Sequence, residues 1–156
     1  MKRLLNRRVR RPKDQGHIYK ELTDKDEFGI FETYKDLFML SLVVGYLEEK
    51  RKPFKETLEL INWQVFNDRT DEPVINMIAY LETNNLALLY DHQDDSFDEK
   101  LTIAEEYAAS GAEKLYELVM DDQKNGLRNL IDFIDQYQGI KDYSELQKKR
   151  LAEDLL

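Results

Sequence analysis

The longest apolar run of the chain is Leu37 to Val44, which only Ser41 interrupts. An amphipathic surface helix shows polar residues at every turn, so a run of this kind is expected to be buried nearly all round. It is far too short to cross a bilayer, which requires about 20 apolar residues. We therefore predict that it forms the central helix of a soluble domain.

Residues around this run set the limits of the central helix. Thr33 is a suitable N-cap, and Asp36 three residues later gives the pair the form of a capping box. Acidic residues at the start and basic residues at the end suit the helix dipole, so we predict a helix over about 33–50. Gly45 lies inside it and costs about 1 kcal/mol relative to alanine. We therefore expect a neighbouring helix to pack closely at Gly45.

The hydrophobic period changes after the central helix. Apolar and polar residues alternate near 57–66, and the segment INWQVF has the β-branched and aromatic composition of a strand. This favours a short strand or hairpin near 57–66, although a helix from Phe54 to Phe66 also fits the pattern. Trp63, the only tryptophan, is expected to anchor the core or its edge.

Helical periodicity dominates the remainder. Asp71, a glutamate and Pro73 form a strong start signal for a helix that ends just after Thr83. Apolar residues then recur at helical spacing in the C-terminal third, where Ser110-Gly111 either breaks the helix or lets it pack tightly. A terminal helix is expected from Ser144.

These patterns predict a mainly α fold, a compact helical domain around the buried central helix. The predicted organisation is a basic N-terminal arm over 1–13, a single helical domain over 14–139 and a C-terminal helical extension over 140–156. We find no internal repeat of fixed period and no secretory signal, so a cytoplasmic location is expected.

Charge is distributed unevenly along the 156 residues, whose net charge is -9. The first 13 residues hold seven basic side chains and no acidic one, whereas the rest holds 16 basic against 32 acidic residues, a balance of -16. Such an arm attracts phosphates while the body repels them. A solubilising tail and a contact to nucleic acid or an acidic partner explain the arm equally well.

The arm contains no aromatic residue that could stack on a base, so any DNA contact would be to phosphates and independent of sequence. A second basic cluster closes the central helix. The candidate DNA-contact residues are the basic side chains of the arm and of this cluster: Lys2, Arg3, Arg7, Arg8, Arg10, Arg11, Lys13, Lys50, Arg51 and Lys52.

An acidic loop over Asp91–Glu99 places several carboxylates beside His92. It lacks the glycine and the closing glutamate of an EF-hand loop, and the only other histidine is His17. We therefore read it chiefly as a solvated loop leading into a helix N-terminus, with a divalent-ion contact and catalysis as lesser alternatives.

Few residues of the chain are typical of catalytic sites. There is no cysteine, which excludes a disulfide framework and a thiolate metal site, and there are only two histidines. No glycine pattern matches a phosphate-binding loop, and no serine lies in a nucleophile elbow. We assign no catalytic, cofactor-binding or metal-binding residue, and expect no cofactor.

Three segments together resemble a known family. They are RVRRPKD, then FGIFETYKDLFMLSLVVGY with the KRKPF that follows, and INWQVF leading into DEPVINMIAYLET. Their order and spacing resemble the small accessory proteins encoded beside bacterial DNA phosphorothioation (Dnd) modification and restriction genes. The likeness covers about residues 7–120 and leaves 140–156 outside. It implies antiphage defence that acts on, or recognises, sulfur-modified DNA, and it supplies no catalytic residues.

The favoured function is therefore a non-enzymatic accessory or adaptor protein of such a system. Its acidic body would dock on another component of the modification or restriction system, while the arm touches the DNA backbone; no membrane contact is expected. A variant is a homodimer in which the arms pair as a ribbon ahead of two helices. The alternative is a small metal-dependent enzyme or nuclease subunit that uses the 91–99 loop. An acidic protein-binding module or DNA mimic is weaker, because the basic arm argues against mimicry.

Overall fold

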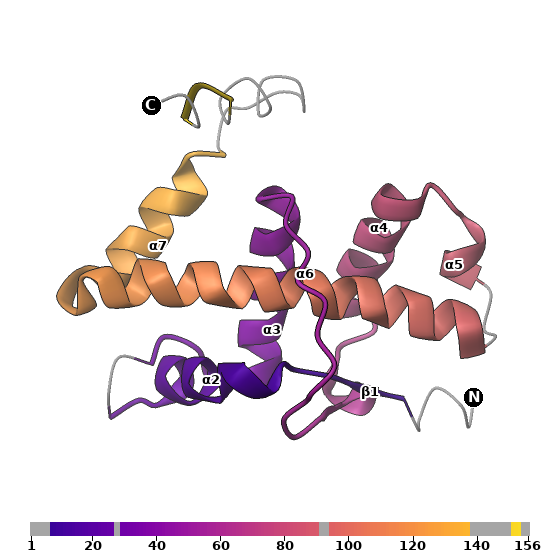
Figure 1. The fold of residues 1–156 in the computed structure, drawn as a ribbon, viewed down its shortest axis with the longest axis horizontal. Coiled ribbons are helices and arrows are strands. Elements are labelled where there is room, and N and C mark those ends of the chain that lie inside the picture. Colours follow the sequence, from indigo (N-terminus) through magenta and orange to yellow (C-terminus); the bar gives the residue numbers. More distant parts are fainter. Residues whose placement is uncertain (1–6, 27–28, 91–93, 138–150, 154–156) are drawn as a thin grey trace. The chain divides into compact units, whose positions relative to one another are not determined.

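The chain divides into two compact units, residues 1–117 and 118–156. The first is helical apart from a small two-stranded sheet, which confirms the predicted fold class. No helix among the described residues combines the length and the apolar composition needed to cross a membrane. The computed structural model describes residues 7–26, 29–90, 94–137 and 151–153 (Figure 1).

The central helix α3 runs from Tyr34 to Leu47. The side-chain oxygen of Thr33 accepts a hydrogen bond from the backbone N–H of Asp36 at 3.1 Å, as the capping pattern predicts. No residue from 37 to 46 is exposed, which agrees with burial nearly all round. The helix ends three residues earlier than predicted, because the chain enters the left-handed region at Glu49, where φ is 56°.

A second long helix, α6 (Asp94–Asp121), crosses α3 (Figure 1). At the crossing the two backbones touch through glycines. A Cβ on Gly45 would overlap the carbonyl of Tyr107, and a Cβ on Gly111 would lie 2.8 Å from the backbone nitrogen of Gly45. Close packing at Gly45 is thus confirmed, and Ser110-Gly111 permits tight packing without breaking the helix.

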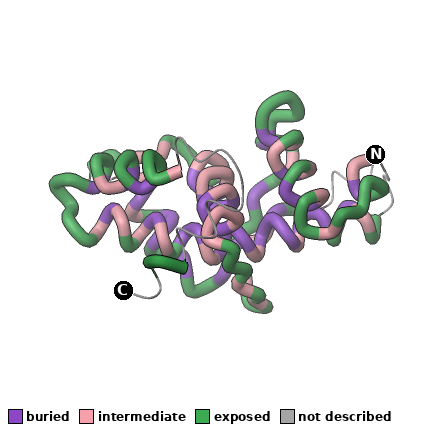
Figure 2. Tube along the Cα trace, turned by 90° about the horizontal axis from the view of Figure 1, so that it is seen from above, coloured by how far each residue is buried: buried purple, intermediate pink, exposed green. Residues whose placement is uncertain are grey.

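The core of the first unit is built from buried faces of its helices. Figure 2 shows buried and exposed positions following one another along the trace, as expected where each helix turns one face inward. The largest fully buried apolar side chains of this unit are Tyr19, Leu22, Leu37, Phe38, Leu42, Ile75, Leu101 and Leu115.

A two-stranded antiparallel sheet joins the N-terminal residues to the middle of the chain. Strand β1 (Arg8–Val9) pairs with β2 (Ile61–Asn62), with Val9 opposite Ile61. The 3₁₀ turn η2 (Trp63–Val65) follows β2 directly. A short strand near 57–66 is therefore confirmed, and the alternative helix is wrong. The partner of this strand is the N-terminal segment.

Residues 7–13 differ from the predicted arm, because they are packed into the first unit. Beyond β1, Pro12 forms a bridge with Thr57, and the turn η1 (Lys13–Gln15) leads into α2 (Gly16–Thr23). Val9 is fully buried. β1 pairs with a strand of its own chain, and the homodimer variant stays a prediction. Residues 1–6 of the predicted arm lie outside the described residues.

The predicted aromatic anchor is present. The ring of Trp63 stacks on that of Phe66, with 5.2 Å between centroids, and meets the ring of Phe97 edge to face at the same distance. Phe66 in turn meets Phe38 at 5.7 Å. These rings join η2 to both α3 and α6, which explains why the segment after β2 is held in place.

The helix predicted from Asp71 is α4 (Asp71–Thr83), and it ends at Asn84, where φ is 55°. The carboxylate of Asp71 accepts hydrogen bonds from the backbone N–H of Asn67 at 2.7 Å and from Nζ of Lys35 at 2.9 Å. Asp71 therefore ties the start of α4 to α3. The short helix α5 (Ala87–Tyr90) follows.

The second unit contains the last turn of α6, the turn η3 (Gln123–Asn125) and α7 (Gly126–Asp135). The side-chain amide of Asn129 donates to the carbonyl of Leu118 at 3.1 Å, which holds α7 against the end of α6. The predicted terminal helix lies largely outside the described residues, although 151–153 are helical. The predicted limits 14–139 and 140–156 stay predictions.

Candidate nucleic-acid interface

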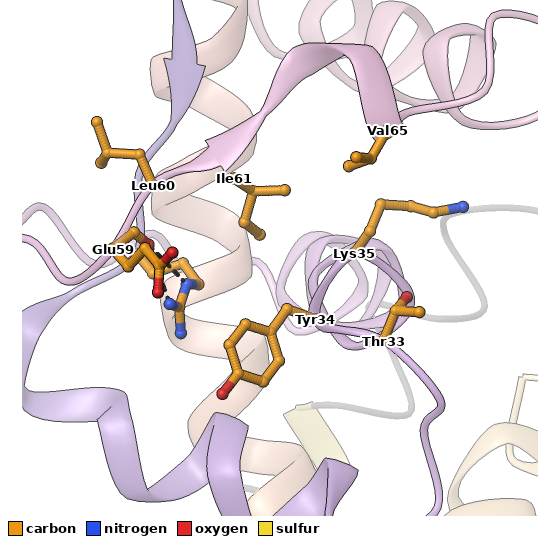
Figure 3. A pocket seen from close by; sticks show the side chains of 8 residues that line it. Thr33, Tyr34, Lys35, Glu59, Leu60, Ile61 and Val65 are labelled. Carbon is orange, nitrogen blue, oxygen red and sulfur yellow. Dashed lines mark hydrogen bonds between the residues drawn. The ribbon is translucent and has the colours of Figure 1, made fainter.

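Arg11, a candidate DNA-contact residue, is only 4% exposed. Its Nε and Nη2 both donate to the carbonyl oxygen of Glu59, at 3.2 and 2.9 Å. The guanidinium carbon lies 4.5 Å from the ring centroid of Tyr19 and 4.6 Å from that of Tyr34. Glu59 and Tyr34 border the pocket drawn in Figure 3. Arg11 is therefore held between two aromatic rings and presents almost no surface to a DNA duplex.

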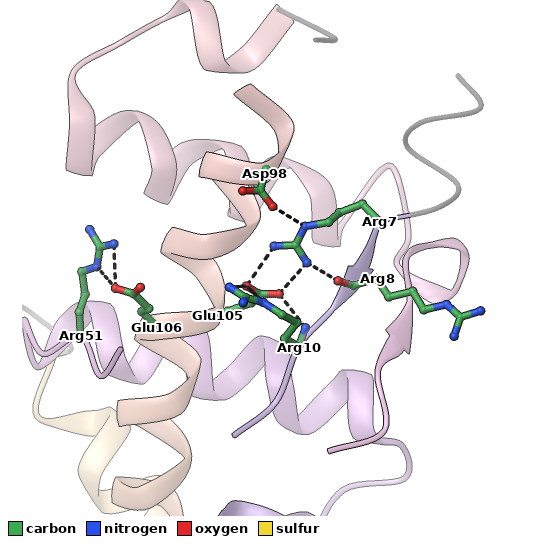
Figure 4. A network of polar contacts seen from close by, with 7 residues as sticks. All are labelled: Arg7, Arg8, Arg10, Arg51, Asp98, Glu105 and Glu106. Carbon is green, nitrogen blue, oxygen red and sulfur yellow. Dashed lines mark hydrogen bonds and ion pairs between the residues drawn. The ribbon is translucent and has the colours of Figure 1, made fainter. Parts of the chain in front are cut away.

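Arg7 and Arg10 converge on one buried carboxylate, that of Glu105 on α6 (Figure 4). Two nitrogens of Arg7 donate to its oxygens at 3.0 and 3.1 Å, and Nε of Arg7 also donates to Asp98 at 2.8 Å. Nε of Arg10 donates to the same carboxylate at 3.0 Å, and the backbone N–H of Arg10 donates at 2.6 Å. The side chain of Glu105 has no exposed surface. This cluster fastens the N-terminal segment to α6.

The charge of Arg7 is stabilised in this cluster. Burial alone would lower the pKa of Arg7, but the hydrogen bonds and the charge of Glu105, with a further contribution from Asp98, outweigh it and raise the pKa above its ordinary value. For Arg11 the balance is opposite: burial lowers the pKa, and the attraction of nearby groups offsets only part of that effect.

The second basic cluster is also engaged within the chain. Arg51 pairs with Glu82 at 2.8 Å and with Glu106 at 2.9 Å, and its guanidinium carbon lies 5.7 Å from the ring centroid of Tyr107. Lys52 pairs with Glu113, and more distantly with Asp14 at 3.6 Å. These pairs link the segment after α3 to α6, so both cations have a structural role.

Four of the described candidates are exposed: Arg8, Lys13, Lys50 and Arg51, of which Arg51 is paired with Glu82 and Glu106. The side chain of Arg8 extends away from the Glu105 cluster in Figure 4. Lys50 borders a hollow that it shares with Lys114 and three glutamates, and this excess of acid lowers its attraction for phosphates. Lys2 and Arg3 lie outside the described residues. The structure thus does not bring the eight described candidates together as one basic surface.

Sequence reasoning did not single out Glu105, although a signal exists. It lies between apolar residues on α6, four residues after Leu101 and three before Ala108, both of which are buried. An acidic residue in the buried stripe of a helix usually has a cationic partner. That pattern indicates a buried ion pair, but it does not say which cation completes it.

The acidic segment predicted as a loop lies partly outside the described residues, which exclude 91–93. From Asp94 onward it forms the first turns of α6, where Phe97 is buried and Asp98 pairs with Arg7. Within the part of the chain that the structure describes, no group of three or more histidine, aspartate or glutamate side chains is arranged to hold a metal ion. The metal-dependent alternative, which also involves residues 91–93, stays a prediction.

No curated protein and no solved structure matches the chain. A protein-family model, described as DNA sulphur modification system-associated protein 4, matches residues 8–153. The match extends well past residue 120, where the resemblance seen in the sequence ended, and includes most of the segment that was left outside it. The chain therefore belongs to the family of DNA sulphur modification system-associated protein 4, an accessory of that modification system.

Proposed function

We propose that this protein is a non-enzymatic adaptor of a DNA sulphur modification system that takes part in antiphage defence in the cytoplasm. It docks its acidic helical body on a basic surface of another protein of the system. Its contact with DNA is confined to phosphates and is made by a small number of exposed cations. No cofactor takes part.

The proposed docking on a protein is supported by the arginines, which pair with acidic residues of their own chain. Arg7, Arg10 and Arg51 are paired with Asp98, Glu82 and glutamates of α6, so their charges are neutralised within the chain. The full sequence is nevertheless acidic, with a net charge of -9. An acidic surface repels phosphates and attracts a basic protein surface, which favours a protein as the main partner.

The docking half is tested by purifying the tagged full-length chain from its native host after nuclease treatment. We expect other components of the sulphur modification system to co-purify, and the complex to form again from purified components. Complex formation should weaken as salt is raised from 50 to 500 mM, because the contact is electrostatic. Failure of every purified component to bind at low salt would contradict the docking proposal.

The proposed DNA contact is tested by substituting Arg8 and Lys13. Deletion of the whole arm is unsuitable, because it would also remove the arginines that pair with Glu105. We expect the double variant Arg8→Gln/Lys13→Gln to bind duplex DNA more weakly. The slope of log affinity against log salt should fall by about 1.8, because each lost phosphate contact contributes about 0.9. Fluorescence anisotropy with a labelled duplex measures both quantities.

The matched control is Lys124→Gln/Arg128→Gln, which removes the same charge from exposed positions of the second unit. We expect its salt slope to equal that of the unchanged protein. Equal losses in the two double variants would mean that net charge alone acts. An unchanged slope in the Arg8/Lys13 variant would show that the segment makes no phosphate contact.

A further inference from the structure

An open pocket of about 410 Å³ lies between β2 and the first turn of α3. Figure 3 shows Ile61 and Val65 on one side of this space and Tyr34 on the other. Three of the apolar side chains that line it are unusually exposed: Tyr34 at 39%, Leu60 at 36% and Val65 at 53%. The walls therefore offer apolar surface that a ligand could cover.

The polar group at this pocket is Arg11. Although it is 4% exposed, none of the carboxylates in the described part of the chain forms an ion pair with it. Nε and Nη2 are used by the carbonyl of Glu59, whereas Nη1 has no hydrogen-bond acceptor among the described residues. Arg11 therefore keeps one donor that the described residues do not use, and an anion would supply the counter-charge that it lacks there.

The other charges around the pocket differ in their effect. Lys35 lines it, but its Nζ is already paired with Asp71 at 2.9 Å. The carboxylate of Glu59 lies close enough to act on the charge of Arg11, yet it is exposed and forms no ion pair with it. The first turn of α3, which also borders the pocket, adds the positive end of a helix dipole. Glu59 therefore opposes an anion here, while Arg11 and the helix attract one.

We propose that this pocket binds an organic anion, a carboxylate or phosphate ester attached to an apolar group. The anionic oxygens accept a hydrogen bond from Nη1 of Arg11. The apolar part covers Leu60, Ile61 and Val65. This site is separate from the protein docking and the phosphate contacts proposed above, and it stands or falls independently of them.

The binding test uses the full-length protein and four probes, followed by NMR of its backbone amides. We expect hexanoate and phenyl phosphate to give saturable shifts of pocket resonances, with dissociation constants on the order of 1 mM, which suits ligands of about a dozen heavy atoms or fewer. Inorganic phosphate lacks the apolar part, and phenol lacks the charge, so both should bind at least tenfold more weakly. Absence of saturable shifts with all four probes, or equal shifts with all four, would overturn the proposal.

Two substitutions at exposed rim positions test the site without disturbing the buried arginine. Val65→Glu adds a negative charge beside the apolar wall and should weaken phenyl phosphate binding at least tenfold. Glu59→Gln removes the opposing acid and should tighten binding about threefold. The matched control is Met77→Glu on α4, since Met77 is 54% exposed and lies outside the pocket lining.

Arg11→Lys removes Nη1 while keeping the charge, and should reduce the preference for phenyl phosphate over phenol, because the directed hydrogen bond is lost while the positive charge remains. Far-UV circular dichroism checks whether this variant folds. Even if it does not fold, the two rim variants decide the question. Equal binding by Val65→Glu and Met77→Glu, or weaker binding by Glu59→Gln, would show that the shifts do not arise from an anion in this pocket.

Discussion

Replacing Gly111 by alanine is expected to lower the free energy of unfolding by about 3 kcal/mol, the upper part of the usual range for overpacking. The new Cβ would overlap the carbonyl of Ser41 and lie 2.8 Å from the backbone nitrogen of Gly45. These are backbone atoms, which cannot turn aside as a side-chain end can, so α3 and α6 would have to separate. The intrinsic helix preference of alanine, about 1 kcal/mol, offsets only part of this cost. Urea unfolding followed by circular dichroism measures the difference.

The control for this prediction is Gly16→Ala in the first turn of α2. A Cβ at Gly16 would lie 3.5 Å from a methyl group of Leu58, an ordinary contact. We expect its stability to change by no more than about 0.5 kcal/mol. If Gly111→Ala is as stable as the unchanged protein, α3 and α6 do not pack closely through Gly45 and Gly111.

Features with a local signal were predicted correctly from the sequence. The cap at Thr33 is recognisable from Thr33 and Asp36 alone. The start of α4 is recognisable from the acidic residues and the proline in its first turn. The close approach at Gly45 was also indicated locally, because glycine destabilises a helix interior and is expected there where a neighbouring backbone leaves no space for a side chain. What the sequence did not identify was the partner, Gly111, 66 positions further along. Its neighbourhood allowed a helix break equally well.

The basic N-terminal segment was misjudged because its partners are distant in sequence. Arg7 and Glu105 are 98 residues apart, and Arg11 reaches the carbonyl of Glu59 across 48 residues. A window of neighbouring residues contains seven cations and no acid, so it has the pattern of an exposed arm. In the folded chain, α6 supplies Glu105 and Asp98 as partners for two of these cations, Arg7 and Arg10. Long-range ion pairing cannot be deduced from a one-dimensional charge pattern.

The paired N-terminal segment has fewer exposed cations than a free arm would have. A free arm would bring its full charge to DNA, whereas the paired segment leaves Arg8 and Lys13 as the exposed cations within residues 7–13. Fewer phosphate contacts mean weaker and less salt-dependent binding. Membership of a DNA modification family therefore does not require this chain to be a strong DNA binder, which agrees with the protein docking that we propose.

Glu105→Gln is expected to destabilise the protein by about 3 kcal/mol, the lower end of the range for removing one partner of a buried ion pair. The lower end applies because the side chains of Arg7 and Arg10 keep 17% and 34% of their surface exposed and stay partly hydrated. The substitution keeps the shape of the side chain but leaves two cations without their shared counter-charge. Because β1 is fastened through the backbone N–H of Arg10, that amide should also exchange its hydrogen faster.

Glu113→Gln is the matched control on the same helix, since Glu113 pairs with Lys52 while its side chain is 48% exposed. An exposed pair contributes at most about 1 kcal/mol and is screened by salt, so we expect a small effect that disappears at 1 M salt. The effect of Glu105→Gln should persist there, because its carboxylate is buried. In an Arg7→Gln background, Glu105→Gln should cost less than in the unchanged protein. Two results would contradict this prediction: equal losses of stability in the two glutamate variants, or losses at positions 7 and 105 that simply add. Either result would mean that Glu105 does not hold the N-terminal segment, whose cations could then reach DNA.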